Sequence, residues 1–232
     1  MASEEVIDTL RELAEVLQNQ RTLGAALAAI AEAATTSVPR CTAASVALSL
    51  EGRPSTAAIT ARVALELDLV QYDTDDGPCL RSFRTVEALR LDLVDQHDEF
   101  PHFALVARRA GIRNVLSVPA TRDGAVVGTL NLYSRSGPFD DTALSIASVM
   151  ASQVAIAICR SPEFAAARDI VDRAQQQADD AGEINLATGL LMVNESCTAE
   201  QADALLRSAA AQDEHSVLQI ARRIIEQHRR GG

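Results

Sequence analysis

The spacing of apolar side chains predicts two helices at the start of the chain, over residues 4–19 and 23–34. The first helix carries a heptad-like seam of apolar side chains: Val6, Leu10, Leu13 and Leu17. The second helix is expected to end before Pro39, because a residue that precedes proline is disfavoured in a helix. The seam is short, so it suggests a partner helix without establishing a coiled coil.

After these helices the apolar pattern changes to a period of two, which is typical of strands with one polar face. Strands are predicted over residues 46–50, 55–60, 89–93, 114–118 and 125–133. The fourth strand is expected to end at Pro119, and Arg122-Asp123-Gly124 predicts a hairpin turn into the fifth. Helical segments are expected within residues 63–83 and over residues 103–110, where Gly111 marks the helix end.

A long helix is predicted over residues 140–158, with apolar side chains on two of its sides. A helix that is apolar on two sides must be covered on both. One side is expected to pack on the sheet, and the other on a helix from a second subunit. With about five antiparallel strands flanked by helices, this part of the chain is expected to be an α+β domain.

A connector follows from Arg160 to Gly182, where the helical spacing is interrupted at Pro162 and then continues. The seam of this connector is rich in alanine, which allows close helix approach but buries little area. The run Asp179-Asp180-Ala181-Gly182 is expected to break the helix. A connector held this weakly suits signal transmission, and it equally suits a plain tether.

Residues 184–225 predict three short helices joined by two tight turns. Thr198 with Gln201, and Ser216 with Gln219, form capping-box signatures before the second and third helices. A short amphipathic helix cannot bury its apolar stripe alone. The three helices are therefore expected to pack together, on a partner, or both.

The composition fits a soluble globular protein with an aliphatic core, because 47% of its 232 residues are hydrophobic and only 3% are aromatic. The formal net charge of −11 argues against a generic binder of polyanions. The N-terminal segment is acidic and lacks a secretory signal, and no uninterrupted apolar run reaches the roughly 20 residues of a membrane span. We therefore expect a cytoplasmic protein that does not enter a membrane.

The chain carries no sequence motif typical of catalysis or metal binding. The chain has no His-Glu-x-x-His, no Gly-rich phosphate loop and no Gly-x-Ser-x-Gly elbow. Its cysteines are widely scattered, without Cys-x-x-Cys spacing: Cys41, Cys79, Cys159 and Cys197. We therefore expect no catalytic residues, no metal site and no cofactor.

A basic cluster near the C-terminus could bind nucleic acid. It consists of Arg207, Arg222, Arg223, Arg229 and Arg230. Guanidinium groups match phosphate geometry and stack on splayed bases. Residues 163–232 nevertheless hold 7 Arg against 12 Asp and Glu, so binding would depend on this local patch. The alternative is a charged face whose cations favour a helix C-terminus.

Three blocks of the C-terminal segment keep the order and spacing of a known domain. They are Ala187-Thr188-Gly189-Leu190-Leu191-Met192, Thr198 to Ala202 with Leu205-Leu206-Arg207, and Val217 to Ile225. The segment resembles the ANTAR domain, a three-helix RNA-binding module of bacterial transcription antiterminators. The resemblance and the basic cluster together give these candidate RNA-binding residues: Thr188, Arg207, Arg222, Arg223 and Arg229. Thr188 stands where the family usually has lysine, and Asp203 where it usually has an aromatic side chain.

Five blocks farther upstream also keep their order: Leu67 to Tyr72, Asp76 to Leu80, Phe100 to Phe103, Gly111 to Pro119 and Gly128 to Tyr133. Over residues 20–160 the chain resembles a GAF domain, a small-molecule sensor fold, of the variety that commonly precedes an ANTAR domain. The resemblance implies a ligand site at these residues: Asp76, Cys79, Asp92, Phe103, Ser117 and Tyr133. For Cys79 and Phe103 a plain packing role is the alternative.

Together these patterns predict an N-terminal helix and GAF domain over residues 1–160, a helical connector over 161–182 and a three-helix ANTAR-like domain over 183–232. The favoured function is a dimeric regulator without enzymatic activity. Its GAF domain would sense a small molecule or partner, and its ANTAR domain would bind hairpin RNA in nascent transcripts and cause antitermination. The alternative is a dimerisation or protein-interaction scaffold whose ANTAR-like tail has lost RNA binding.

Overall fold

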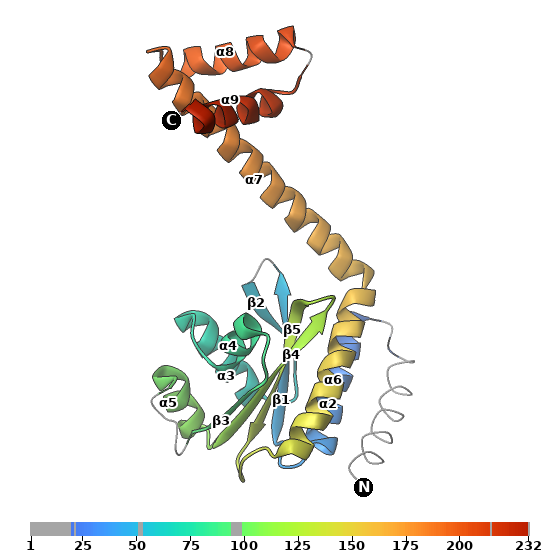
Figure 1. Cartoon of the computed structure of the whole chain (residues 1–232). Coiled ribbons are helices and arrows are strands. Elements are labelled where there is room, and N and C mark those ends of the chain that lie inside the picture. The colour runs from blue at the N-terminus through green and yellow to red at the C-terminus, as the bar shows by residue number, and fades with distance from the viewer. Residues whose placement is uncertain (1–19, 21, 51–52, 94–98, 214, 232) are drawn as a thin grey trace. The chain divides into compact units, whose positions relative to one another are not determined.

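The computed structural model of the protein describes residues 20, 22–50, 53–93, 99–213 and 215–231 (Figure 1). The chain divides into two compact units, Met1–Arg168 and Asp169–Gly232. The boundary between the units lies inside one helix, α7 (Pro162–Asn194). The helix predicted over residues 4–19 lies outside the described residues.

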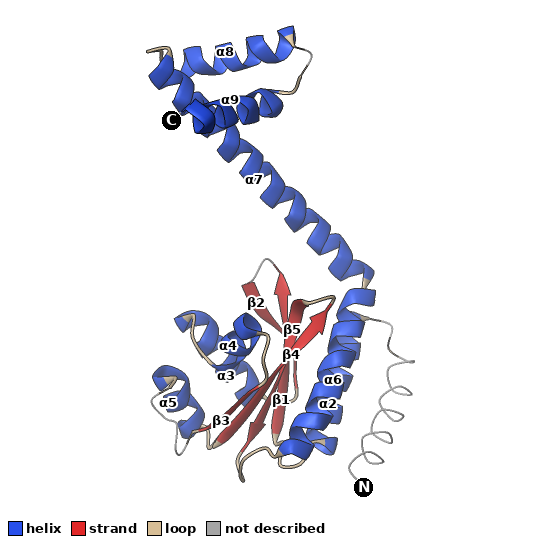
Figure 2. Ribbon diagram, in the orientation of Figure 1, coloured by secondary structure: helices blue, strands red, loops and turns tan. Residues whose placement is uncertain are grey.

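The first unit is built on a five-stranded sheet in the order β2-β1-β5-β4-β3, in which all neighbours are antiparallel (Figure 2). Its strands are β1 (Ala43–Leu50), β2 (Arg53–Ile59), β3 (Leu89–Asp92), β4 (Asn114–Arg122) and β5 (Ala125–Ser134). Helices cover both faces of this sheet. The predicted α+β class and the number of strands are confirmed.

The predicted hairpin between β4 and β5 is confirmed, with Asp123 and Gly124 as its two turn residues at φ values of 51° and 81°. Positive φ at both positions is the geometry that joins antiparallel strands most tightly. The expected end of β4 at Pro119 is wrong, because the strand continues to Arg122. β3 pairs with β4 only as far as Ser117, so among the described strands Pro119 has β5 as its one neighbour. Proline is tolerated where a strand lies at the edge of a sheet.

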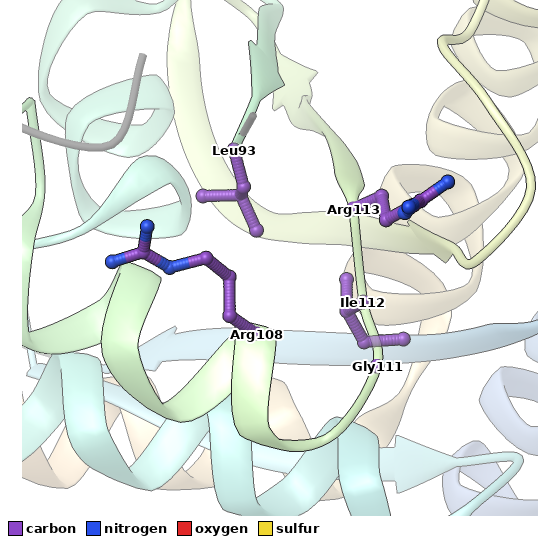
Figure 3. Close-up of a pocket in the computed structure, with 5 residues that line it drawn as sticks. All are labelled: Leu93, Arg108, Gly111, Ile112 and Arg113. Carbon is purple, nitrogen blue, oxygen red and sulfur yellow. The ribbon is translucent and has the colours of Figure 1, made fainter. Parts of the chain in front are cut away.

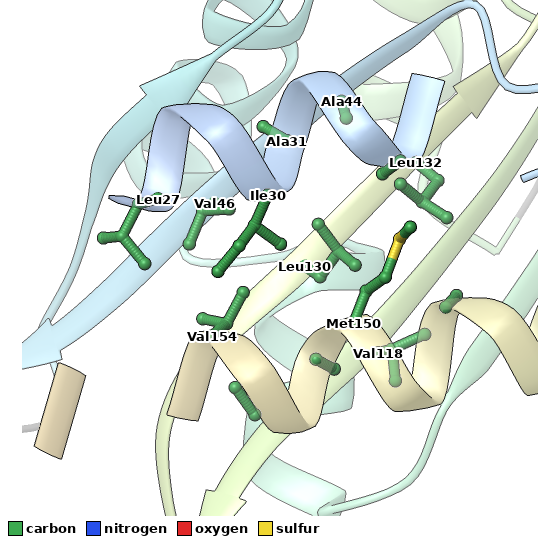
Figure 4. Packing of buried hydrophobic residues seen from close by; sticks show 14 of the residues in the cluster. Leu27, Ile30, Ala31, Ala44, Val46, Val118, Leu130, Leu132, Met150 and Val154 are labelled. Atoms are coloured by element: carbon green, nitrogen blue, oxygen red, sulfur yellow. The ribbon is translucent and has the colours of Figure 1, made fainter. Parts of the chain in front are cut away.

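One face of the sheet is covered by α2 (Leu23–Ser37) and α6 (Asp141–Arg160), which contact each other (Figure 4). Leu27 and Ile30 of α2 belong to one buried cluster with Met150 of α6 and inward side chains of β1 and β5. α2 of the same chain contacts α6 beside the sheet. The expected packing of the second apolar side of α6 on another subunit stays a prediction. α6 is long and apolar enough to cross a membrane. Its packing in this cluster shows that it is apolar because it is a core helix.

The opposite face is covered by α3 (Arg62–Thr74), α4 (Pro78–Thr85) and α5 (Pro101–Arg109). Its apolar cluster lies mainly between α3, α5 and the sheet, and includes Leu67, Leu91, Phe100 and Phe103. Under α3 and α4, by contrast, several inward strand positions are polar and fully buried. This change from apolar to polar packing makes the face the first place to look for a site.

The second unit contains the end of α7, α8 (Ala199–Gln212) and α9 (Val217–Gly231), which enclose a small core. The buried core residues are Ala187, Leu206, Ala210, Ile220, Ala221 and Ile225. Both predicted capping boxes are confirmed, at Thr198 with Gln201 and at Ser216 with Gln219. These reciprocal bonds satisfy amide groups that the first turn of each helix leaves without a partner.

The predicted break at residues 179–182 is wrong, because α7 runs without interruption through them. Side-chain hydrogen bonds at i,i+4 spacing support this stretch, from Gln175 to Asp179 at 2.9 Å and from Gln176 to Asp180 at 2.8 Å. One glycine inside a helix costs only about 1 kcal/mol, which such bonds and the neighbouring turns offset. The first helix of the predicted trio is therefore the end of a long helix.

Candidate functional site

Asp68 on α3 is fully buried, and its carboxyl group accepts hydrogen bonds from four side chains. Oδ1 accepts from Ser45 Oγ at 3.0 Å and from Tyr133 OH at 2.9 Å. Oδ2 accepts from Thr56 Oγ1 at 2.8 Å, and Asn131 Nδ2 donates to Oδ1 at 3.4 Å. We call these five residues the Asp68 network. Because the donors belong to β1, β2 and β5, the network fixes α3 to the sheet.

Burial raises the pKa of Asp68 from its ordinary value of 3.8 to about 6, because desolvation penalises the charged carboxylate. The four hydrogen bonds favour the charged form and oppose this shift. Desolvation is the larger effect, so Asp68 exchanges its proton close to neutral pH. The network therefore contains a titratable group whose charge state depends on how well it is shielded from water.

A second set of buried contacts joins α3 to α4. Gln71 Oε1 accepts from the backbone N–H of Cys79 at 2.8 Å, and Cys79 Sγ lies 3.0 Å from Thr129 Oγ1. Gly77 lies between the two helices with φ 152°, and a Cβ there would be 2.3 Å from Gln71 Cγ. Burial raises the pKa of the Cys79 thiol to about 12, so little reactive thiolate forms at neutral pH.

In and next to the Asp68 network, two buried oxygens on the same face of the sheet make no hydrogen bond with the described residues: Ser117 Oγ and Asn131 Oδ1. Ser117 is the register partner of Asn131, and Asn131 is that of Ser45, so the three form one polar row across β4, β5 and β1. A buried acceptor without a partner costs about 1–3 kcal/mol. This row can therefore accept hydrogen bonds from a bound molecule.

The six predicted ligand residues do not gather at one place. Tyr133 belongs to the Asp68 network, and Cys79 and Ser117 lie close to it in the layer between the sheet and α4. Phe103 packs in the apolar cluster under α5. Asp76 is exposed in the loop before α4, and Asp92 is half-buried at the end of β3. Ligand binding by these six residues stays a prediction.

A pocket of about 300 Å³ opens elsewhere in the first unit, next to the end of α5. It is lined by Leu93, Arg108, Gly111, Ile112 and Arg113, and none of the predicted ligand residues contributes to it. Figure 3 shows the guanidinium groups of Arg108 and Arg113 pointing away from each other. The two cations therefore do not converge on a single anion.

In the second unit, the predicted RNA-binding arginines meet carboxylates of the same unit. Arg222 Nε on α9 lies 2.5 Å from Glu183 Oε2 on α7, and its Nη2 lies 3.4 Å from Asp180 Oδ1. Arg223 pairs with Asp213 at the end of α8. These contacts fix α9 to its two neighbouring helices. They also neutralise two of the charges that were expected to face RNA.

The other three candidate RNA-binding residues differ in the contacts that their side chains make. Arg207 Nε lies 2.7 Å from Asp203 Oδ2 one turn earlier on α8. Thr188 Oγ1 donates to the carbonyl oxygen of Ile184 at 2.9 Å, so its hydroxyl group is satisfied within α7. Arg229 forms no ion pair with any described residue. RNA binding by these residues stays a prediction.

Comparisons with known proteins agree with this two-part architecture. The family model of the GAF domain matches residues 20–158, and that of the ANTAR domain matches residues 172–225. The first match corresponds to the sheet and its covering helices, and the second to most of α7–α9. No curated protein matches the chain.

Solved structures similar to the first unit support the same fold at low sequence identity. The GAF domain of a phosphoenolpyruvate-protein phosphotransferase from Coxiella burnetii is 17% identical with a TM-score of 0.56, over 70% of this chain and 98% of that one. The GAF domain of an Acinetobacter phosphoenolpyruvate-protein phosphotransferase is 18% identical with a TM-score of 0.52, over 66% and 92%. The free methionine-R-sulfoxide reductase of Neisseria meningitidis is 17% identical with a TM-score of 0.52, over 72% and 92%.

These likenesses establish a shared fold alone, since identities below 25% leave chemistry open. The family models say more, because the GAF match covers more than half of the chain and the ANTAR match identifies the helical unit. The chain belongs to the GAF domain family and is a regulator in which a GAF domain is followed by an ANTAR domain.

Proposed function

We propose that this regulator binds hairpin RNA in nascent transcripts through the arginine surface of α8 and α9, and that binding causes transcription antitermination. The observation that carries the proposal is the arrangement of α9, where Arg222 and Arg223 are each half exposed beside the exposed Arg229. Forked guanidinium groups on one helix suit the phosphates and splayed bases of a folded RNA.

Replacing Arg222 with alanine is expected to weaken binding to hexanucleotide-loop hairpin RNA by about fivefold to tenfold, because one charge-assisted phosphate contact is lost. The slope of log affinity against log salt is expected to fall by about 0.7–0.9. Fluorescence anisotropy of labelled RNA at several salt concentrations measures both quantities. Arg173→Ala is the control, because Arg173 is an exposed arginine of the same unit that forms no ion pair with the described residues. Equal effects of the two variants would contradict the proposed surface.

A scaffold without RNA binding is the second candidate, and the ion pairs of the second unit favour it. Arg207, Arg222 and Arg223 are each paired with a carboxylate, and the Thr188 hydroxyl is turned to its own helix. Under this candidate the unit would hold protein partners or a second copy of the chain. Wild-type chain that binds no hairpin RNA even at low salt would support it.

For the GAF domain we propose that the signal is a small molecule bound between the sheet and α3–α4, beside the Asp68 network. Ser117 Oγ and Asn131 Oδ1 support this position, because they are buried acceptors without a partner among the described residues. Native mass spectrometry of the purified full-length chain is expected to show a small-molecule adduct that Ser117→Val reduces. Ser145→Val, at an exposed position of α6, is the control. An adduct that survives Ser117→Val, or no adduct on any chain, would contradict this position.

The same proposal includes a cytoplasmic homodimer without enzymatic activity. The raised pKa of Cys79 supports the absence of thiol chemistry, since a buried thiol near pKa 12 is a poor nucleophile at neutral pH. Cys41 is similar, because burial raises the pKa of its thiol to about 11. Sedimentation of the full-length chain tests the dimer, and an assay of sulfoxide reduction tests the absence of catalysis.

A further inference from the structure

Most arginines of α8 and α9 form an ion pair with a carboxylate of the same unit. Arg222, Arg223 and Arg207 each have a carboxylate partner inside the unit, and Arg230 Nη2 lies 3.9 Å from Glu226 Oε2. We call the acids that hold the first three arginines the pairing carboxylates: Asp180, Glu183, Asp203 and Asp213. Each arginine proposed to contact RNA, except Arg229, thus has an internal anion in place of a phosphate.

These ion pairs are exposed enough for each arginine to exchange its carboxylate for a phosphate. The side chains of Arg222 and Arg223 are each 50% exposed, and their partners Glu183 and Asp213 are each 41% exposed. An exposed ion pair is weak because water and salt screen it. A phosphate group can therefore displace the carboxylate, but the displaced carboxylate remains close by and repels the incoming phosphate.

The net charge of the second unit adds to the repulsion of an incoming phosphate. Residues 169–232 hold 6 Arg against 11 Asp and Glu, so the unit carries a net charge of −5. Long-range attraction for RNA is therefore absent, and affinity depends on contacts made after the arginines change partner. An RNA that displaces several carboxylates at once gains several contacts, whereas an RNA that reaches one arginine gains little.

From these contacts we infer that the pairing carboxylates are internal competitors of RNA, which lower its affinity and restrict binding to folded RNAs that engage several arginines together. The inference rests on the proposed RNA binding. Glu183 and Asp213 act on the central arginines of α9, and Asp203 acts on Arg207 of α8. Removing these acids makes the unit a tighter and less selective RNA binder.

The test uses the full-length chain and a hairpin RNA, with an unstructured RNA of the same length as the second ligand. The double variant Glu183→Gln with Asp213→Asn is expected to bind the hairpin about fivefold to twentyfold tighter than wild type. Its preference for the hairpin over the unstructured RNA is expected to shrink. The control is Glu195→Gln with Glu200→Gln, which changes net charge equally at two exposed acids that form no ion pair with described residues. The control is expected to change affinity less than about twofold.

Because the pair between Arg222 and Glu183 joins two helices, the double variant is also checked by circular dichroism. Asp203→Asn serves as a second variant, since its pair with Arg207 lies within one helix and its loss leaves the contacts between helices intact. It is expected to tighten hairpin binding about twofold to fourfold. Equal tightening by the control, or unchanged or weaker binding by both pairing variants, would overturn the inference and leave the proposed RNA binding in place. If wild type and all variants bind no RNA, the inference and the proposed function both fail.

Discussion

Replacing Asp68 with alanine is expected to lower the free energy of unfolding of the first unit by about 3–5 kcal/mol at pH 5. The variant removes a fully buried carboxyl group and leaves the hydroxyl groups of Ser45 and Tyr133 without their acceptor. Each buried donor without a partner costs about 1–3 kcal/mol, and the vacated volume adds to that cost. Urea unfolding followed by tyrosine fluorescence measures this effect in the first unit alone, because the chain has no Trp and its two tyrosines are Tyr72 and Tyr133.

Asp68 also makes the stability of the first unit depend on pH, and its raised pKa fixes the direction of that dependence. The pKa of Asp68 is about 6 in the folded chain against an ordinary value of 3.8, so the folded state holds this proton more tightly. The stabilisation from the protonated carboxyl group is fully present below about pH 3.8 and is lost as the pH rises through about 6. The total loss is about 3 kcal/mol.

Asp68→Asn separates the charge from the shape of the side chain. The amide oxygen still accepts from Tyr133 and Ser45, and the side chain stays uncharged at every pH. We expect this variant to be close to wild type at pH 4 and more stable than wild type at pH 8. Asp76→Asn is the control, because Asp76 is exposed in the loop before α4. A stability difference between wild type and Asp68→Asn that stays constant from pH 4 to pH 8 would contradict the raised pKa of Asp68.

Most of the fold could be predicted because its signals are local. The period of two along the strands, the turn at Asp123-Gly124 and the capping boxes at Thr198 and Ser216 each depend on a few neighbouring residues. The two errors concern competition between local and tertiary effects. Pro119 was expected to end a strand, but it lies beyond the part of β4 that pairs with β3, where proline is tolerated. Gly182 was expected to help break α7, but bonds along the helix offset its low propensity.

The Asp68 network was not predicted, because its members come together only in the tertiary structure. Asp68 is 23 residues from Ser45 and 65 residues from Tyr133 along the chain. A sequence signal did exist, since Ser45 and Asn131 occupy inward strand positions where apolar residues are usual. Polar residues at inward positions of neighbouring strands, with an acid on the inward face of the covering helix, indicate such a network.

For the arginine surface, the sequence identified the residues but not the acids that pair with them. Its residues were identified from spacing along α9, but the partners of Arg222 lie 39 and 42 residues earlier on α7. Helical spacing tells which arginines share a face, and it cannot tell which acids from other helices face them. The acidic excess of the C-terminal residues is consistent with such pairing, without identifying the partners.

The core of the second unit is small, and for that reason Leu206→Ala is expected to abolish most RNA binding while the GAF domain stays folded. Leu206 is fully buried, and half of the six buried core residues are alanines that contribute little area. Truncating a buried leucine costs about 2–5 kcal/mol. A core of this size supplies only about 3–5 kcal/mol in total, so the variant unit is expected to be largely unfolded at 25 °C.

Leu205→Ala is the matched control for this variant, because Leu205 is the adjacent residue of α8 and is 47% exposed. It is expected to cost less than about 1 kcal/mol and to leave RNA binding unchanged. Circular dichroism at 222 nm reports the loss of α7–α9 helix in Leu206→Ala, while tyrosine fluorescence reports that the first unit is intact. If Leu206→Ala bound hairpin RNA as wild type does, the RNA contacts would not depend on the packed arrangement of α7, α8 and α9. The arginine surface would then no longer explain recognition, because the spacing of its guanidinium groups exists only when those helices are packed.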